Sequence, residues 1–215
     1  MRTRIVATLL ALTVCVAPVF GATWTYLAKY LRPGVLFVQG TDDDPQRIQP
    51  DYCTAFIIAK GRALTAGHCV RPDRDDYELS VDGRPAQLIK YHQYVNNVNI
   101  REDIALLAFE PEKTDRILVL APHDAILGNP IGTVGYAYAF GYQFQMGYVQ
   151  LAHWSNTGMM FIDLNVYSGD SGGPIFNALG QVIGLNIAVL TRNSPTMHFT
   201  LAMTVSEIQN FLSRK

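Results

Sequence analysis

The sequence predicts an all-β fold whose short antiparallel strands close into barrels or pack as a sandwich. Short apolar runs rich in β-branched and aromatic residues follow one another closely, and turn residues separate them. No helical pattern stands between consecutive runs, which argues against a doubly wound α/β sheet. The expected strands cover residues 35–40, 55–60, 63–67, 77–83, 86–91, 104–110, 133–140, 146–154, 159–165, 182–190 and 197–203.

Composition bounds the class of protein and its partners. The chain of 215 residues is 49% hydrophobic and 11% aromatic, which is enough to bury a sizeable core. Its formal net charge is −1, and no long run of Lys and Arg occurs. The sequence therefore lacks the electrostatic signature of a nucleic-acid-binding protein.

A single helix is expected, at the C-terminal end of the chain. In "TVSEIQNFLSRK", Thr204 can act as the N-cap and Glu207 stands three residues later, which is the pattern of a capping box. Ile208, Phe211 and Leu212 share one face, so we expect a helix over residues 204–213 that packs on the body. Charge and proline interrupt the strand pattern at residues 110–123, where two β units would join.

The N-terminus has the layout of a secretory signal. Two arginines precede an apolar stretch at residues 5–22, and cleavage after Gly21 would place Val19 and Gly21 at the small-residue positions. An uncleaved membrane anchor is the alternative, because the span from Ile5 to Ala28 carries no charge and is long enough to cross a bilayer. We therefore expect a signal peptide over residues 1–21 and a secreted or periplasmic protein, or else one held at a membrane by this segment.

The cysteine count agrees with export. Removal of a signal would leave Cys53 and Cys69, an even number that suits one disulfide in an oxidising compartment, with two free buried thiols as the alternative. A zinc site made by Cys53, His68 and Cys69 would lack a fourth ligand and the usual CxxC spacing. Neither a metal nor a cofactor is expected.

Three polar residues stand in distinctive local settings. Ser171 lies in "GDSGGP", Asp103 sits at the edge of an apolar strand, and His68 follows an apolar run and precedes Cys69. Each alone is read most simply as a structural residue: a turn hydroxyl, a strand cap and a half-buried histidine. Together they supply the nucleophile, base and orienting carboxylate that acyl transfer requires.

The motifs "TAGHC", "DIALL" and "GDSGGP", in the order His, Asp, Ser, closely resemble the trypsin-like serine peptidases. Residues 125–151 and 161–190 look like the HtrA or Deg branch of exported proteases. The resemblance covers residues 22–215 and implies the chymotrypsin-like fold: two six-stranded antiparallel β-barrels, at about residues 30–115 and 120–203, before the terminal helix. No PDZ domain is expected, because the chain as given ends soon after that helix.

The resemblance assigns roles residue by residue. It makes Ser171 the nucleophile, His68 the general base and later acid, and Asp103 the group that holds the imidazole. The backbone N–H groups of Gly169 and Ser171 would form the oxyanion hole, since glycine permits the unusual backbone of this turn. Cys53 and Cys69, sixteen residues apart, match the family's disulfide around the catalytic histidine.

The resemblance also bears on substrate preference. Asn165 stands six residues before the nucleophile, where enzymes that cut after Lys or Arg carry an aspartate. Asn186, Ile187 and Ala188 would line the pocket and pair with the substrate backbone, which suggests small or medium uncharged side chains before the scissile bond. Asp170 lacks the amino-terminal partner that it has in digestive trypsins, and HtrA-type enzymes commonly carry asparagine there.

The predicted function is a serine endopeptidase that cleaves polypeptides through an acyl-enzyme intermediate. A catalytically inactive binding module on the same fold is the alternative, which a substituted triad would favour, and no triad member is substituted here. An esterase-like hydrolase is disfavoured because the strand-to-helix setting of the GxSxG elbow is missing. HtrA relatives often form trimers, but no residue pattern here predicts an oligomer.

Overall fold

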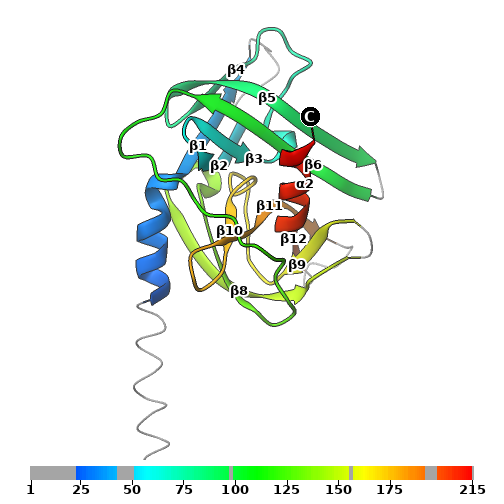
Figure 1. The fold of residues 1–215 in the computed structure, drawn as a ribbon. Helices are drawn as coiled ribbons and strands as arrows, with labels where there is room; N and C mark the ends of the chain where they lie inside the picture. The colour runs from blue at the N-terminus through cyan, green and yellow to red at the C-terminus, as the bar shows by residue number, and fades with distance from the viewer. Residues whose placement is uncertain (1–22, 43–50, 97–98, 155–156, 192–197, 215) are drawn as a thin grey trace, which may run out of the picture.

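The computed structural model describes residues 23–42, 51–96, 99–154, 157–191 and 198–214. These residues form two closed six-stranded antiparallel barrels, which lie one above the other in Figure 1. The predicted all-β fold class is confirmed. The predicted signal peptide and its cleavage site lie outside the described residues.

The first barrel is closed in the strand order β1-β2-β3-β6-β5-β4. Its strands are β1 (Val35–Thr41), β2 (Asp51–Ala59), β3 (Arg62–Thr65), β4 (Glu78–Val81), β5 (Arg84–Asn96) and β6 (Asn99–Phe109). Apolar side chains that point inward, among them Leu36, Phe56, Leu64 and Leu107, are almost completely buried. Burial of these side chains stabilises the barrel interior. Closure of the sheet also leaves no unpaired strand edge.

The second barrel repeats this topology. Its strands are β7 (Pro130–Gly135), β8 (Gln143–Leu151), β9 (Met159–Ile162), β10 (Pro174–Phe176), β11 (Val182–Thr191) and β12 (His198–Thr204). Read around the ring from β7, the order is β7-β8-β9-β12-β11-β10, which is the order of the first barrel shifted by six strands. Ile131, Ile162, Ile175 and Ile183 are buried in a second apolar cluster.

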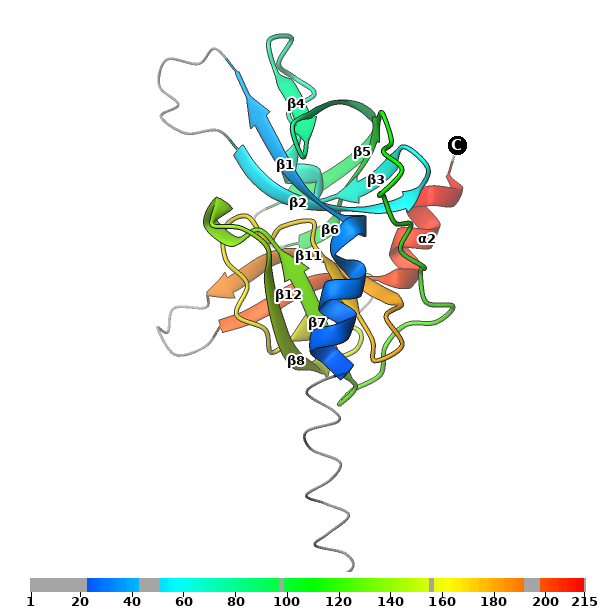
Figure 2. The same ribbon diagram turned by 90° about the vertical axis from the view of Figure 1, so that its left-hand side faces the viewer.

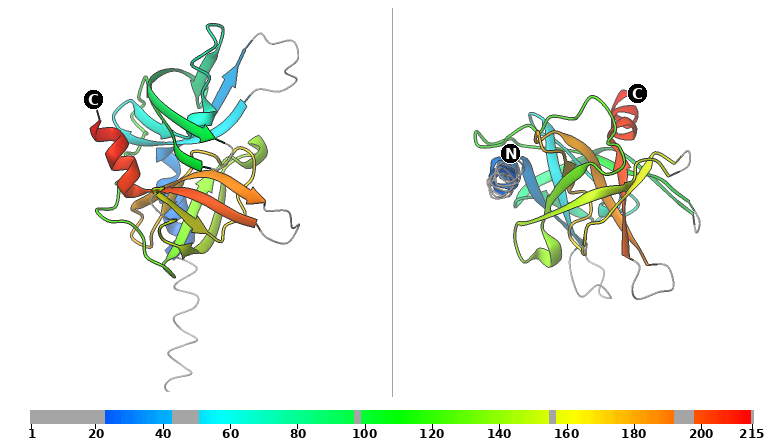
Figure 3. Two further views of the ribbon diagram at one scale, coloured as in Figure 1. Left: turned by 90° about the vertical axis from the view of Figure 1, so that its right-hand side faces the viewer. Right: turned by 90° about the horizontal axis from the view of Figure 1, so that it is seen from below.

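The C-terminal helix α2 (Val205–Ser213) leaves β12 of the second barrel and runs toward the first (Figure 3). Thr204 stands at the N-cap as predicted, but its side chain makes no capping hydrogen bond. Asp124 accepts hydrogen bonds from the backbone N–H of Ser206 at 2.8 Å and from its hydroxyl at 2.7 Å. The predicted capping box is therefore wrong, because Thr204 is buried and a carboxylate from another loop satisfies the helix start.

A helix over residues 23–31, which the sequence pattern did not predict, lies along the second barrel (Figure 2). Trp24, Ala28 and Leu31 form its buried face, at the spacing that places side chains on one side of a helix. The Trp24 ring lies 5.8 Å from that of Phe176 between centroids. Within the described residues, no helix is long and apolar enough to cross a membrane.

Candidate active site

His68 and Asp103 are joined by two short contacts within the first barrel. The turn η2 (Gly67–Cys69) carries His68 at the end of β3, and β6 carries Asp103. One carboxylate oxygen, Oδ2, lies 2.6 Å from Nδ1 of His68, and the other accepts the His68 backbone N–H at 2.7 Å. The Asp103 side chain is 3% exposed and that of His68 is 36% exposed. The carboxylate is thus buried against one ring nitrogen, and the other side of the ring is open to solvent.

Gly67 makes this close approach possible. A Cβ at this position would lie 2.6 Å from the His92 carbonyl oxygen and 2.9 Å from Oδ1 of Asp103. A side chain there would therefore push the carboxylate away from the His68 backbone. The glycine in "TAGHC" therefore lets His68 and Asp103 approach one another closely.

A disulfide joins Cys53 of β2 to Cys69, next to His68. It ties the histidine turn covalently to the neighbouring strand. The sulfur atoms of Cys53 and Cys69 and a His68 ring nitrogen lie within 4.8 Å of one another, the one such group of three found among the described residues. Both sulfur atoms are bonded to one another in the disulfide, whereas zinc is coordinated by thiolates, so this group does not form a zinc site.

Ser171 stands on a turn that precedes β10 in the second barrel. The turn is held by the N–H of Gly172, which donates to the Asn186 carbonyl at 2.8 Å, and by that of Gly173, which donates to the Asp170 carbonyl at 2.9 Å. The Ser171 hydroxyl donates to the Ile187 carbonyl at 3.4 Å. Between these described residues, no hydrogen bond joins the Ser171 hydroxyl to the His68 ring; such catalytic bonds are often long without substrate.

The two barrels meet at the turn that carries Ser171. The Thr54 N–H of β2 donates to the Ser171 carbonyl at 2.8 Å, and the Cys69 sulfur lies 3.9 Å from the same oxygen. Gly172 has a φ of +81°, and a Cβ on it would lie 2.3 Å from the Thr54 carbonyl oxygen and 2.7 Å from the Ala66 nitrogen. Only glycine lets the serine turn pack this closely on the segment that carries His68.

The N–H groups of Gly169 and Ser171 donate no hydrogen bond to another described residue. Those of Asp170, Gly172 and Gly173, in the same turn, all do. Gly169 has a φ of +100°, in the left-handed region that favours glycine. Two neighbouring amides are therefore available to a ligand atom.

Asp170 is buried and pairs with backbone rather than with an amino terminus. Its Oδ2 accepts the Tyr167 N–H at 3.0 Å, and it also accepts the Ala137 N–H. Burial raises the pKa of the Asp170 carboxyl, and these two amides work in the opposite direction. Asp170 therefore pairs with two backbone amides, which the sequence alone did not indicate.

The loop beside the Ser171 turn departs from the predicted strand over residues 133–140. Strand β7 ends at Gly135, and the turn η3 (Ala137–Ala139) follows, with left-handed φ values of 52° at Tyr138 and 57° at Ala139. The Tyr138 N–H donates to the Ser168 carbonyl at 2.6 Å, so this bend contacts the turn that carries Ser171. The predicted strand therefore ends early: Tyr136 is buried, whereas Tyr138 is 53% and Phe140 84% exposed.

The predicted pocket residues are distributed unequally. Asn165 is exposed. Asn186 is buried, and its side-chain amide donates to the Thr133 hydroxyl of β7 at 2.7 Å, while its backbone N–H and carbonyl bond to Gly173 and Gly172 of the Ser171 turn. Ile187 is buried at an irregularity in β11, with its carbonyl at Ser171, and the Ala188 side chain lies outside the described part of the chain.

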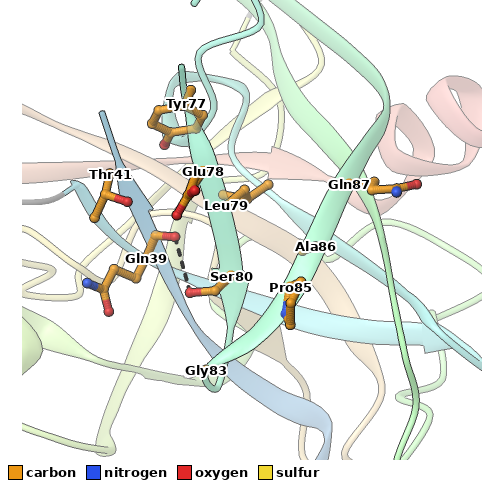
Figure 4. Close-up of a pocket in the computed structure, with 10 residues that line it drawn as sticks. All are labelled: Gln39, Thr41, Tyr77, Glu78, Leu79, Ser80, Gly83, Pro85, Ala86 and Gln87. Atoms are coloured by element: carbon orange, nitrogen blue, oxygen red, sulfur yellow. Dashed lines mark hydrogen bonds between the residues drawn. The ribbon is translucent and has the colours of Figure 1, made fainter. Parts of the chain in front are cut away.

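A pocket elsewhere on the first barrel is separate from these groups. It has a volume of about 570 Å³ and is lined by strands β1, β4 and β5 and by Tyr77 just before β4 (Figure 4). His68, Asp103 and Ser171 are not among the described residues that line it. This pocket is therefore not where His68, Asp103 and Ser171 lie.

Two closed six-stranded barrels, with a histidine–aspartate pair on the first and a serine turn with two available amides on the second, make up the chymotrypsin-like fold. The family model described as the trypsin-like peptidase domain matches residues 53–185. The chain belongs to this family.

Relatives of the chain are exported and organellar proteases. A probable periplasmic serine endoprotease, DegP-like, from Pseudomonas fulva is 28% identical over 170 residues, which are 75% of this chain and 34% of the relative. Protease Do-like 2, chloroplastic, from Arabidopsis thaliana is 28% identical over 173 residues, which are 74% of this chain and 27% of the relative. The chain thus spans about a third of the length of the curated relatives that it matches.

Solved structures share the fold. A serine endoprotease from Yersinia pestis superposes with a TM-score of 0.68 at 18% identity, over 88% of this chain and 65% of that one. The active form of a protease from M. tuberculosis superposes with a TM-score of 0.66 at 20% identity, over 87% of this chain and 82% of that one. At such identities the likeness supports the two-barrel architecture.

Proposed function

We propose that this chain hydrolyses peptide bonds with Ser171 as the nucleophile, His68 as the general base and Asp103 as the group that orients the imidazole. The observation that carries the proposal is the 2.6 Å contact between Asp103 and Nδ1 of His68, made where the serine turn packs on the histidine segment. A carboxylate at Nδ1 keeps the proton on that nitrogen and leaves Nε2 free to accept one.

The proposed reaction has two halves. The Ser171 hydroxyl adds to the scissile carbonyl as His68 takes its proton, and His68 then gives the proton to the leaving amine, which leaves an acyl-enzyme. Water, activated by the same imidazole, hydrolyses that ester. The N–H groups of Gly169 and Ser171 would stabilise the negative oxygen in both halves, at about 3 kcal/mol for each donor.

The proposed substrates are extended polypeptide segments. Asn165 is neutral where a carboxylate would select Lys or Arg, which supports a preference for small or medium uncharged side chains before the scissile bond. The names of the relatives support a periplasmic or secreted location, with membrane attachment if the N-terminal segment is retained.

One observation favours the alternative of a binding module without turnover. The Ser171 hydroxyl donates to the Ile187 carbonyl rather than to the histidine. Rotation about the serine Cα–Cβ bond would have to release that bond before the base can act. The two functions predict opposite results with an active-site probe.

The test is covalent labelling of the purified full chain with a fluorophosphonate, together with casein hydrolysis. We expect labelling and cleavage by the wild type, and loss of both in Ser171→Ala. Ser168→Ala, three residues away and exposed, is the matched control and should label normally. Cleavage that persists in Ser171→Ala, or a folded wild type that neither labels nor cleaves, would contradict the proposal.

A further inference from the structure

Thr54 of β2 touches the nucleophile turn with both its backbone and its side chain. It is a fully buried residue of the first barrel, next to the disulfide cysteine Cys53. Its N–H donates to the Ser171 carbonyl at 2.8 Å, and its hydroxyl donates to the Gly169 carbonyl at 2.7 Å. One threonine thus contacts both residues whose amides are available to a ligand.

The direction of these bonds is set by chemistry. A hydroxyl has one proton and two lone pairs, the Gly169 carbonyl can only accept, and the Tyr136 N–H, 3.0 Å from the same hydroxyl, can only donate. The Thr54 carbonyl accepts from the Thr65 hydroxyl at 2.7 Å. Thr54 is therefore fixed in place, and its hydroxyl joins the nucleophile turn to the loop that follows β7.

Gly169 is the residue that most needs such a contact. It has no side chain, and its φ of +100° is one of many conformations that a glycine can adopt. The hydrogen bond to its carbonyl restrains the peptide unit between Gly169 and Asp170, and the Tyr138 N–H, which donates to the Ser168 carbonyl at 2.6 Å, restrains the unit that carries the Gly169 N–H. An oxyanion donor must lie within about 2.7–3.1 Å of the developing charge, so a small rotation of this residue weakens it.

We propose that Thr54 is a positioning residue for the oxyanion hole. Its hydroxyl holds Gly169 and its amide holds Ser171, so that the two N–H groups point to one place beside the nucleophile. The inference rests on the proposed function, in which those amides stabilise the tetrahedral intermediate. Because Cys53, next to Thr54, is bonded to Cys69, next to His68, one strand aligns the base and the oxyanion donors.

The decisive variant is Thr54→Val, which keeps the shape of the side chain and removes the hydroxyl. The Gly169 carbonyl and the Tyr136 N–H would then lack a partner in a buried place, and the turn would rotate to find others. We expect kcat to fall by about 10- to 100-fold, with KM within about twofold, because the donors act on the transition state. Thr54→Ser, which restores the hydroxyl, should recover kcat to within about threefold of the wild type.

Thr200→Val is the matched control for buried threonine loss. The Thr200 hydroxyl is buried and donates to the Leu164 carbonyl, so its removal costs stability without touching residues 169–171. We expect its melting temperature to fall about as much as that of Thr54→Val while its kcat stays near the wild-type value. If Thr54→Val does not fold, Thr54→Ala removes the same hydroxyl and carries the same expectation.

Inhibition separates positioning from general damage. A peptide aldehyde forms a tetrahedral adduct that places an oxyanion in the hole, whereas the product peptide does not. In Thr54→Val the aldehyde inhibition constant should rise by the same factor as kcat/KM falls, and that of the product peptide should not change.

An equal loss of kcat in Thr54→Ser and Thr54→Val, or an unchanged aldehyde inhibition constant in Thr54→Val, would overturn the proposed role of Thr54. The proposed function of the chain would still stand. A folded wild type that neither reacts with the fluorophosphonate nor cleaves casein would overturn the proposed function, and this role with it.

Discussion

The two barrels share one strand order, yet they contribute to the site in different physical ways. The first presents His68 and Asp103 on ordered strands and a turn, held by two short polar contacts and a disulfide. The second presents Ser171 on a turn whose glycines at 169 and 172 have left-handed φ values. His68 is positioned by bonds within its own barrel, whereas the turn that carries Ser171 takes part of its shape from the first barrel.

The largest expected effect is in the first barrel, at Asp103→Asn. An asparagine amide can donate to Nδ1 of His68, which favours the wrong tautomer and should lower kcat by about 10⁴-fold at neutral pH while the fold is kept. Steady-state hydrolysis of a peptide ester measures kcat, and far-UV circular dichroism shows whether the fold is kept. Asp115→Asn, which alters a carboxylate paired with Arg84 in the same barrel, should keep its activity. A loss below tenfold in Asp103→Asn would show that this pair does not orient the base.

The next effect tests the contact between the barrels. In Gly172→Ala the new Cβ would meet backbone atoms of Thr54 and Ala66, so the free energy of unfolding should fall by about 3 kcal/mol or more and labelling of Ser171 should be lost. Gly83→Ala is the control, because Gly83 also has a left-handed φ, of +74°, but nothing lies within 4 Å of its added Cβ. It should cost about 1–2 kcal/mol. If urea denaturation shows the same loss of unfolding free energy in Gly172→Ala and Gly83→Ala, steric contact at Gly172 is not the cause of the loss.

Removing the disulfide sharpens the comparison from the side of the first barrel. The double variant Cys53→Ala with Cys69→Ala opens a loop with a sequence separation of 16. On the chain-entropy model the free energy of unfolding should fall by about 3 kcal/mol, which denaturant titration measures. The folded fraction should lose less kcat than Gly172→Ala, since the Asp103 contacts to His68 remain. A larger loss of kcat in the double cysteine variant than in Gly172→Ala would contradict this expectation.

The smallest expected effect concerns Asp170 and pH. Burial raises the pKa of this carboxyl above its ordinary value of 3.8, so the folded protein holds the proton to higher pH than the unfolded chain does. The stability contributed by the protonated form is complete below that ordinary value and is lost as pH rises through the raised pKa. Relative to Asp170→Asn, the wild type should therefore lose stability from about pH 4 upward and then level off. Urea denaturation from pH 4 to 8 measures the difference, and a relative gain with rising pH would contradict the sign.

The sequence predicts what depends on local pattern and misses what depends on distant contacts. Alternating apolar runs indicate strands, and the motif around Ser171 indicates the nucleophile turn. The role of Thr54 has no local signal, because its hydroxyl bonds to a residue 115 positions away. The left-handed turn at Tyr138 is equally hidden, since those residues read as strand, and Asn186 turns inward at an irregularity that alternation does not reveal.

The helix over residues 23–31 limits how the chain can be trimmed or tethered. Since Trp24 and Ala28 are packed into the protein, they are not available to a lipid bilayer, and removal of a leader beyond residue 23 would strip the barrel of a fully buried tryptophan. A membrane anchor, if one is kept, would therefore have to end before Trp24.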